Sequence, residues 1–227
     1  MMPRGSADVR GDQLAALETE HHALLTAPRI TRLLDRAQAN SQGLADWQIA
    51  NLREMRRQRD HAIATPASLV SRLTKACARA EANWLEARRQ GKFEVFAPHL
   101  EEVVHLIRDK AALLGQALNL APYDALVDEF SPGISSADIE SVFKALGRRL
   151  PGLIREVIAL QESRPLQPLN GKFTAAKQRA LAVEVMKAVG FPFDRGRLDE
   201  SEHPFTEGVP GDIRVTTRFD PNDVFSG

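Results

Sequence analysis

The sequence of 227 residues contains a single cysteine, Cys77, and this scarcity excludes two kinds of site. An internal disulfide needs two cysteines, and a zinc site built on thiolates needs several. So little cysteine is typical of proteins that work in a reducing compartment, and we therefore expect a cytoplasmic protein.

Net charge and long apolar runs are missing as well. Thirty basic residues balance thirty acidic ones, so no overall charge favours nucleic acid or an anionic membrane as a partner. No apolar run approaches the roughly 20 residues that a membrane-spanning helix needs. The first residues, MMPRGSADVRGDQLAAL, turn polar at once, which argues against a signal peptide. We expect a soluble protein with no membrane and no nucleic acid among its partners.

Apolar residues recur at three- and four-residue steps along most of the chain, which predicts a mainly α fold. Alanines 76, 80 and 87 would let one long helix approach another closely, and Cys77 is interpreted as a small core residue beside them. Pro151 and Gly152 should kink or break a helix that starts near Ser135. The predicted helices cover about 14–24, 28–37, 44–62, 66–90, 98–114, 123–130, 135–158 and 174–189.

The C-terminal segment has a different character. Residues 191–210 are irregular and rich in glycine, proline and acidic residues. The stretch DIRVTTRF, Asp212–Phe219, then alternates as one β-strand does, with Ile213 and Val215 on one face and Arg214 on the other. We therefore expect helices up to residue 190, followed by a loop and strand segment over 191–227.

Common catalytic patterns are absent. No two of the six histidines are four residues apart, as two zinc ligands on one helix face would be, and no glycine-rich phosphate loop or Gly-x-Ser-x-Gly turn occurs. The histidines before His203 are interpreted as exposed or capping residues. The arginines of 53–59 are interpreted as a solvated helix face. Only His203 and Arg214 look poised for function, and a surface turn with an edge strand is the alternative.

The stretch HPFTEGVPGDIRVTTRFDPND resembles the carboxypeptidase Taq family of zinc metallocarboxypeptidases. A His-Pro-Phe motif and an Asp-x-Arg-x-Thr motif carry the resemblance, which extends over essentially the whole chain through LTKACARAEANWLEARRQGKFEVFAPHLEEVVHL and APYDALVDEFSPGISS. By resemblance, the residues of the two motifs border the substrate cleft: His203, Pro204, Phe205, Asp212, Arg214 and Thr216.

The resemblance implies long antiparallel helices that form the N-terminal cap or wall of a zincin-like helical metallopeptidase, with one C-terminal strand facing the cleft. The family's zinc helix, His-Glu-x-x-His, follows this strand, whereas the sequence ends at Gly227. No zinc ligand and no catalytic residue is therefore assigned, and no zinc is expected on this chain alone. A degenerate gene, a split reading frame and a deliberately shortened chain would each give such a sequence.

Two functions stay open at this point. The chain is either an N-terminal fragment of a zinc metallocarboxypeptidase, which removes C-terminal amino acids from peptides, or a non-catalytic helical module for dimerisation or peptide binding. The first is inactive alone, and its partners would be a peptide substrate and a complementing C-terminal half. The second would form a homodimer through its long helices.

Overall fold

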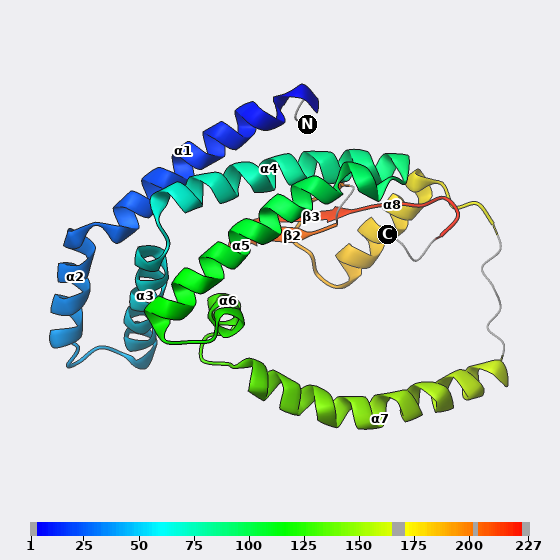
Figure 1. The fold of residues 1–227 in the computed structure, drawn as a ribbon. Coiled ribbons are helices and arrows are strands. Elements are labelled where there is room, and N and C mark those ends of the chain that lie inside the picture. The colour runs from blue at the N-terminus through cyan, green and yellow to red at the C-terminus, as the bar shows by residue number, and fades with distance from the viewer. Residues whose placement is uncertain (1–3, 165–170, 202–203, 224–227) are drawn as a thin grey trace. The chain divides into compact units, whose positions relative to one another are not determined.

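The computed structural model describes residues 4–164, 171–201 and 204–223. Helices dominate them, as the sequence predicts (Figure 1). Contacts divide the chain into two compact units, 1–152 and 153–227. The predicted boundary near residue 190 stays a prediction.

The elements of the described residues are α1 (Ala7–Thr26), α2 (Pro28–Ala39), α3 (Asp46–Ala64), α4 (Ala67–Gln90), α5 (Ala97–Leu118), α6 (Pro122–Phe130), α7 (Ser136–Glu162), α8 (Ala175–Ala188), β1 (Gly196–Glu200), β2 (Thr206–Val209) and β3 (Asp212–Thr217), with short 3-10 turns at Arg4–Ser6 and Phe93–Val95.

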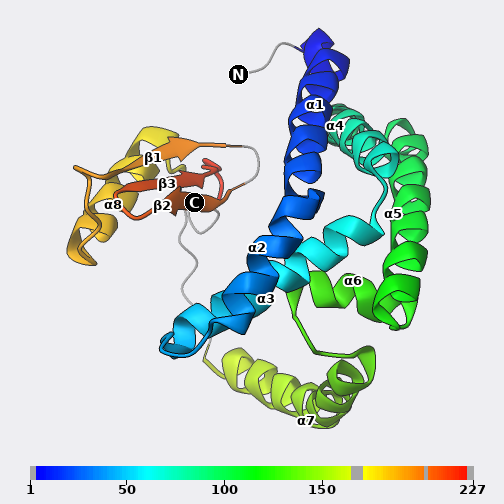
Figure 2. The same cartoon turned by 90° about the vertical axis from the view of Figure 1, so that its left-hand side faces the viewer.

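Small residues bring α1 and α4 close together in the first unit, where the two helices lie side by side (Figure 2). A Cβ atom added to Gly11 of α1 would lie 3.4 Å from the Cβ of Ala78 and 3.6 Å from the Cα of Lys75. Ala15 is buried from the α1 side. The three alanines that the sequence singled out on α4, at 76, 80 and 87, are all buried, so that prediction is confirmed.

The apolar core of this unit lies between α4 and α5. Leu69 and Ala76 of α4 pack with Leu106 of α5, and Leu73 and Val103 cover them. Burying a leucine such as Leu106 contributes about 2 kcal/mol to folding. Cys77 lies outside this core and is exposed, so its interpretation as a core residue is wrong. One residue along a helix is a turn of about 100°, which carries Cys77 away from the face of Ala76.

Two sequence predictions about where helices end have opposite outcomes. Gly91 ends α4 with a left-handed φ of 63°, as its sequence position predicts. Helix α7 runs unbroken through Pro151, so the predicted break is absent. Proline removes one N–H bond from a helix, and the carbonyl that loses its donor belongs to Gly147, on an exposed helix that water can reach.

The second unit contains a three-stranded sheet with the order β1-β3-β2. β3 pairs in parallel with β1, with Leu198 opposite Val215, and antiparallel with β2, with Val209 opposite Asp212. The sequence predicted only β3, and it placed the apolar and polar faces of that strand correctly. Pro210-Gly211 connects β2 to β3, and Gly211 has the positive φ of 95° that this tight turn needs.

A buried glutamine joins the start of α8 to the chain beyond β3. The side-chain amide nitrogen of Gln178 donates to the carbonyl oxygens of Phe173, at 2.8 Å, and Asp220, at 2.6 Å. The backbone N–H of Phe173 donates to the carbonyl of Pro221, at 2.9 Å. Within the second unit, these contacts hold the start of α8 against the chain just beyond β3.

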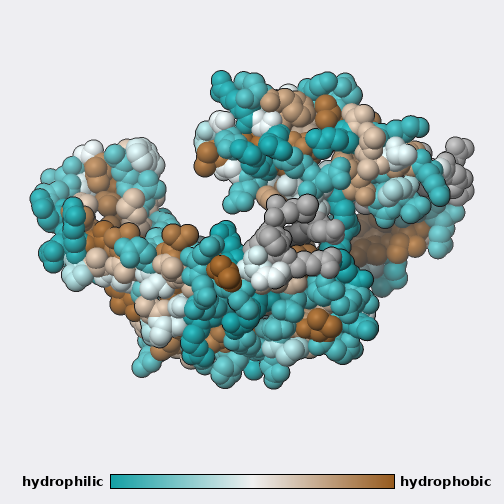
Figure 3. Space-filling view, turned by 90° about the horizontal axis from the view of Figure 1, so that it is seen from above, coloured by the Kyte–Doolittle hydropathy of each residue, from teal (hydrophilic) through white to brown (hydrophobic). Residues whose placement is uncertain are grey.

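Surface composition adds two findings. No helix in the described residues is long and apolar enough to cross a membrane. Apolar side chains nevertheless reach the surface in separate patches, as the brown areas of Figure 3 show on one face. Among them is one side of α7, a helix without a single buried residue.

Candidate functional site

Thr216 of β3 fixes the backbone of Phe205, so the structure brings together one residue from each sequence motif. The backbone N–H of Thr216 donates to the carbonyl of Phe205, at 2.8 Å, and the hydroxyl oxygen of Thr216 accepts from the N–H of Phe205, at 2.9 Å. Both contacts lie at the start of β2. His203 lies outside the described residues, and Pro204 is exposed.

The two charged residues of the second motif bind each other. Arg214 and Asp212 lie two apart on one face of β3, and Nε and a terminal nitrogen of the guanidinium reach the two carboxylate oxygens at 2.5 and 3.0 Å. The hydrogen bond from Arg214 holds the pKa of Asp212 below its ordinary value. About half of each side chain is exposed, at 52% and 55%, so the pair is open to a ligand.

β1 repeats this arrangement beside β3. Arg197 binds Asp199 at 2.6 Å, and the strand register sets Arg197 next to Arg214 and Asp199 next to Thr216. The hydrogen bond from Arg197 lowers the pKa of Asp199, and the charge of Arg214 lowers it further. One face of the sheet therefore carries two arginine–aspartate pairs in a row.

The position of β3 contradicts the edge strand that the sequence left open as an alternative. β3 is the central strand, because β1 and β2 pair with its two sides, so it offers no free edge to a peptide. β2 is an outer strand, and all four of its residues are exposed. An open depression of about 570 Å³ runs along it, lined by Thr206, Glu207, Gly208, Val209, Pro210 and Ile213.

Glycine at position 208 is required by the sheet itself. Its φ of 150° lies where residues with a side chain are rare, and a Cβ atom there would meet the carbonyl oxygen of Asp212 at 2.2 Å. The backbone of β2 thus lies tightly against β3 on one side, while its other side is open among the described residues.

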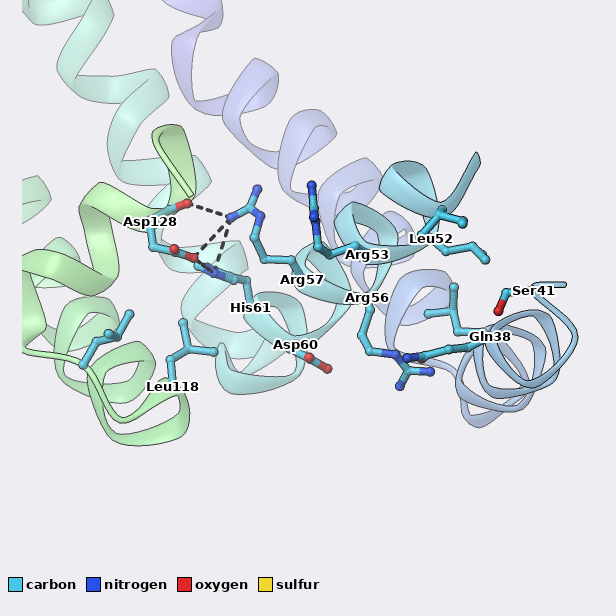
Figure 4. Close-up of a pocket in the computed structure, with 13 residues that line it drawn as sticks. Gln38, Ser41, Leu52, Arg53, Arg56, Arg57, Asp60, His61, Leu118 and Asp128 are labelled. Carbon is cyan, nitrogen blue, oxygen red and sulfur yellow. Dashed lines mark hydrogen bonds and ion pairs between the residues drawn. The ribbon is translucent and has the colours of Figure 1, made fainter. Parts of the chain in front are cut away.

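The first unit contains a buried polar cluster that the sequence reasoning missed. Nε2 of His61 lies 2.8 Å from a carboxylate oxygen of Asp128, so this nitrogen carries the proton and donates it (Figure 4). Arg57 donates to the backbone carbonyl of Asp128, at 2.7 Å, and to both carboxylate oxygens of Glu54, at 2.6 and 2.8 Å. The side chain of His61 is only 8% exposed, so its interpretation as an exposed or capping residue is wrong.

Electrostatics in this cluster favour ionised carboxylates. Desolvation raises the pKa of Asp128, but hydrogen bonds from the Gly133 N–H and from His61, with the charges of His61 and Arg57, outweigh it and hold the pKa below its ordinary value. Glu54 has its pKa lowered to about 2, chiefly by the hydrogen bond from Arg57.

A cavity of about 640 Å³ opens beside the cluster between α2, α3, α5 and α6. Arg53, Arg56 and Arg57 of α3 line it together with apolar residues such as Leu52 and Leu118. Arg56 is held by Asp35, at 2.6 Å. The predicted solvated face of residues 53–59 is therefore wrong in part, because Arg57 is half-buried and Arg59 is buried.

The sequence spacing of three of these residues could have indicated this cluster. Glu54, Arg57 and His61 follow one another at steps of three and four, so they share one helix face. Their partner Asp128 lies 67 residues beyond His61, on another helix. Another histidine behaves as predicted, since Nε2 of His22 caps the end of α3 at the carbonyls of Ala62 and Thr65.

The described residues do not fit a metal site. Across 4–164, 171–201 and 204–223, no three His, Cys, Asp or Glu side chains are grouped so that they could hold a metal ion. No catalytic step through zinc is therefore assigned to these residues.

A family comparison decides what the chain is. The model of the carboxypeptidase Taq (M32) metallopeptidases matches residues 1–227. The chain belongs to the carboxypeptidase Taq family. The resemblance seen in the two sequence motifs is thereby confirmed.

Relatives in the carboxypeptidase Taq family are longer than this chain. Thermostable carboxypeptidase 1 of Thermus thermophilus is 33% identical over 231 residues, which cover 96% of this chain and 45% of that protein. Carboxypeptidase 1 of Bacillus subtilis is 27% identical, with 97% and 44% covered. The chain thus spans less than half the length of these relatives.

Solved structures of the family agree with the fold. Metallocarboxypeptidase 1 of Trypanosoma cruzi superposes with a TM-score of 0.81 at 34% identity, covering 100% of this chain and 46% of the other. The BsuCP crystal structure gives a TM-score of 0.88 at 26% identity, with 100% and 45% covered. The mainly α fold with a small sheet is therefore that of one part of a carboxypeptidase Taq enzyme.

Proposed function

We propose that this chain supplies the N-terminal part of a zinc-dependent carboxypeptidase Taq enzyme, which removes C-terminal amino acids from peptides, and that it is inactive by itself. The observation that carries the proposal is the family match over the whole chain together with its coverage of about 45% of the relatives. The lack of a metal-holding group in the described residues supports the second part. In this proposal a complementing C-terminal half provides the zinc and the chemistry.

A peptide substrate would bind to the outer edge of β2. Extended peptides add to exposed sheet edges through backbone hydrogen bonds, and β2 has such an edge, with the depression of about 570 Å³ beside it. Thr216 would hold Phe205 at the start of that edge through its hydroxyl. Arg214, kept in place by Asp212, would orient a polar group of the peptide, and His203 and Pro204 would border the same cleft.

Separate halves test the proposal. The chain alone should neither bind zinc tightly in calorimetry nor release amino acids from a peptide, because it lacks a cluster of metal ligands. Mixing it with a separately produced C-terminal half of the Thermus thermophilus relative should give zinc-dependent hydrolysis. Stoichiometric zinc binding and hydrolysis by the chain alone would show that the proposal is wrong.

The cleft residues can be tested in the mixed halves. Thr216→Val removes the hydroxyl that accepts from Phe205 and should raise KM several-fold, the change expected for the loss of about 1 kcal/mol of positioning. Thr217→Val is the matched control, because Thr217 is the next residue of β3 and faces the opposite side of the sheet. Equal effects of both substitutions on KM would show that Thr216 does not border the substrate cleft.

The cytoplasm is the proposed location. The single cysteine, exposed on α4, is compatible with a reducing compartment and has no second thiol in the chain with which to pair. Fractionation of cells that express a tagged full chain tests this location.

A further inference from the structure

Strand β2 carries a glutamate whose charge its neighbours do not neutralise. In the antiparallel register Glu207 lies opposite Arg214, so the two side chains lie on the same face of the sheet. Arg214 nevertheless binds both carboxylate oxygens of Asp212 instead. Glu207 is exposed and has no ion-pair partner among the described residues.

The other charges on this face of the sheet are already paired. Arg197 binds Asp199 on β1, at 2.6 Å, and Arg214 binds Asp212 on β3. The charges of these two pairs cancel. Among the described residues of the three strands, Glu207 therefore carries the one uncompensated charge of this face.

Two exposed apolar side chains flank Glu207. Side chains alternate along a strand, so Phe205 and Val209, each two residues from Glu207, lie on its side of the sheet. They are 46% and 65% exposed, and Val209 lines the depression beside β2. The outer strand thus presents a carboxylate between two apolar groups.

A peptide added to the open edge of β2 would extend this row of side chains. Its residue opposite Glu207 would place its own side chain on the same face, next to the carboxylate. A lysine or arginine there supplies the opposite charge and a long aliphatic stem that covers Phe205 or Val209. An acidic residue would set like charges side by side, which weakens the pairing of strands.

We propose that the β2 edge selects peptides with a lysine or arginine at the residue opposite Glu207, and that Glu207 determines this preference. The inference rests on the proposed function, in which this edge binds the peptide substrate. It narrows the substrate class to peptides with a basic side chain at that position.

An NMR titration of the full 227-residue chain tests the preference. Three short peptides of serine and threonine are compared, which differ only in a central lysine, norleucine or glutamate. Norleucine keeps the aliphatic stem of lysine and lacks its charge. The lysine peptide should bind about threefold tighter than the norleucine peptide, and the glutamate peptide should bind most weakly. The amide signals of β2 should shift on binding, and the differences in affinity should shrink in 1 M salt.

Variants of Glu207 assign the preference to this side chain. Glu207→Gln should reduce the affinity for the lysine peptide to that for the norleucine peptide. Glu207→Lys should reverse the order, so that the glutamate peptide binds more tightly than the lysine peptide. Glu200→Lys is the matched control, because it makes the same charge change at an exposed position of β1, the other outer strand, and should leave the order as it is in the wild type. The amide spectrum of each variant checks that the sheet is intact.

The inference and the proposed function fail in different experiments. Equal affinities for the three peptides, no binding of any of them, or equal effects of E207K and E200K would overturn the inference. Glu207 would then only keep other strands away from an open edge. Mixed halves that hydrolyse peptides without a preference for lysine would also overturn it and leave the proposed function standing. A lysine preference in binding, together with mixed halves that hydrolyse nothing, would support the inference and contradict the proposed function.

Discussion

Two arginine–aspartate contacts in this chain have the same chemistry and different surroundings. Arg57 and Asp128 meet between helices of the first unit, with His61 against the same carboxylate, and their side chains are 21% and 16% exposed. Arg214 and Asp212 meet on an open face of β3 and are half exposed. The first pair joins α3 to α6, whereas the second joins two residues of one strand and holds nothing else together.

Burial decides what each contact does. Removing one partner from a buried pair leaves a charge without compensation and costs several kcal/mol, whereas an exposed pair contributes little because water and salt screen it. The buried cluster is therefore interpreted as a structural connection of the helical wall. The exposed pair costs little to break, so its arginine is available to a ligand.

The largest expected effect follows from removing the buried carboxylate. Asp128→Ala leaves the Nε2 proton of His61 without its acceptor and should lower the free energy of unfolding by about 3 kcal/mol. Asp212→Ala is the control on β3 and should cause no resolvable change. Urea denaturation followed by circular dichroism measures both. Equal losses in the two variants would mean that burial does not distinguish the contacts.

A smaller effect is expected when the charge of Arg57 is kept but its shape is changed. Arg57→Lys loses the two-pronged contact with Glu54 and should lower the free energy of unfolding, by less than Asp128→Ala does. Arg53→Lys, on the same helix, should cost nothing, because Arg53 is exposed and has no ion-pair partner in the described residues. The same denaturation experiment compares them, and a neutral R57K would contradict the role given to this guanidinium.

The smallest effect concerns pH. Because the pKa of Asp128 is lowered in the folded chain, its contribution to stability is present above the unfolded value of about 3.9 and is lost as the pH falls through the folded value. The stability gap between wild type and Asp128→Asn should therefore narrow below about pH 4. The pKa of Asp212 is also lowered, so Asp212→Asn should change the free energy of unfolding only slightly in low salt and not at all in 1 M salt. The change caused by Asp128→Asn should persist in 1 M salt. If 1 M salt abolished the effect of Asp128→Asn as well, the Asp128 contact would be as exposed to solvent as the Asp212 contact.

Local patterns were enough to predict much of this fold. The helices follow apolar spacing, and β3 follows alternation, so Ile213 and Arg214 were placed on the correct faces. The other two strands escaped detection because GRLDE and TEGV have no such alternation. Leu198 is the only buried residue of β1, and none of β2 is buried. These strands exist through their pairing with β3, which a local pattern does not contain.

The sites were harder to predict for the same reason. The motif residues Phe205 and Thr216 were named together, yet the hydrogen bonds that join them depend on the β2–β3 register. His61 was overlooked because its meaning comes from Asp128, which is distant in sequence. Position on one helix face identifies candidate side chains, and only the packing of a second element shows which of them have a partner.

The side-chain contacts of Gln178 have a consequence for how the second unit forms. Its amide reaches Phe173 and Asp220, and these residues, 47 positions apart in the chain, meet only after β1, β2 and β3 have been ordered between them. Because such a contact closes a long loop, it is entropically costly to form before the strands are paired, and we expect it to form after them. Hydrogen exchange at the N–H of Phe173 would therefore report the integrity of the whole sheet, including the edge that a peptide would use.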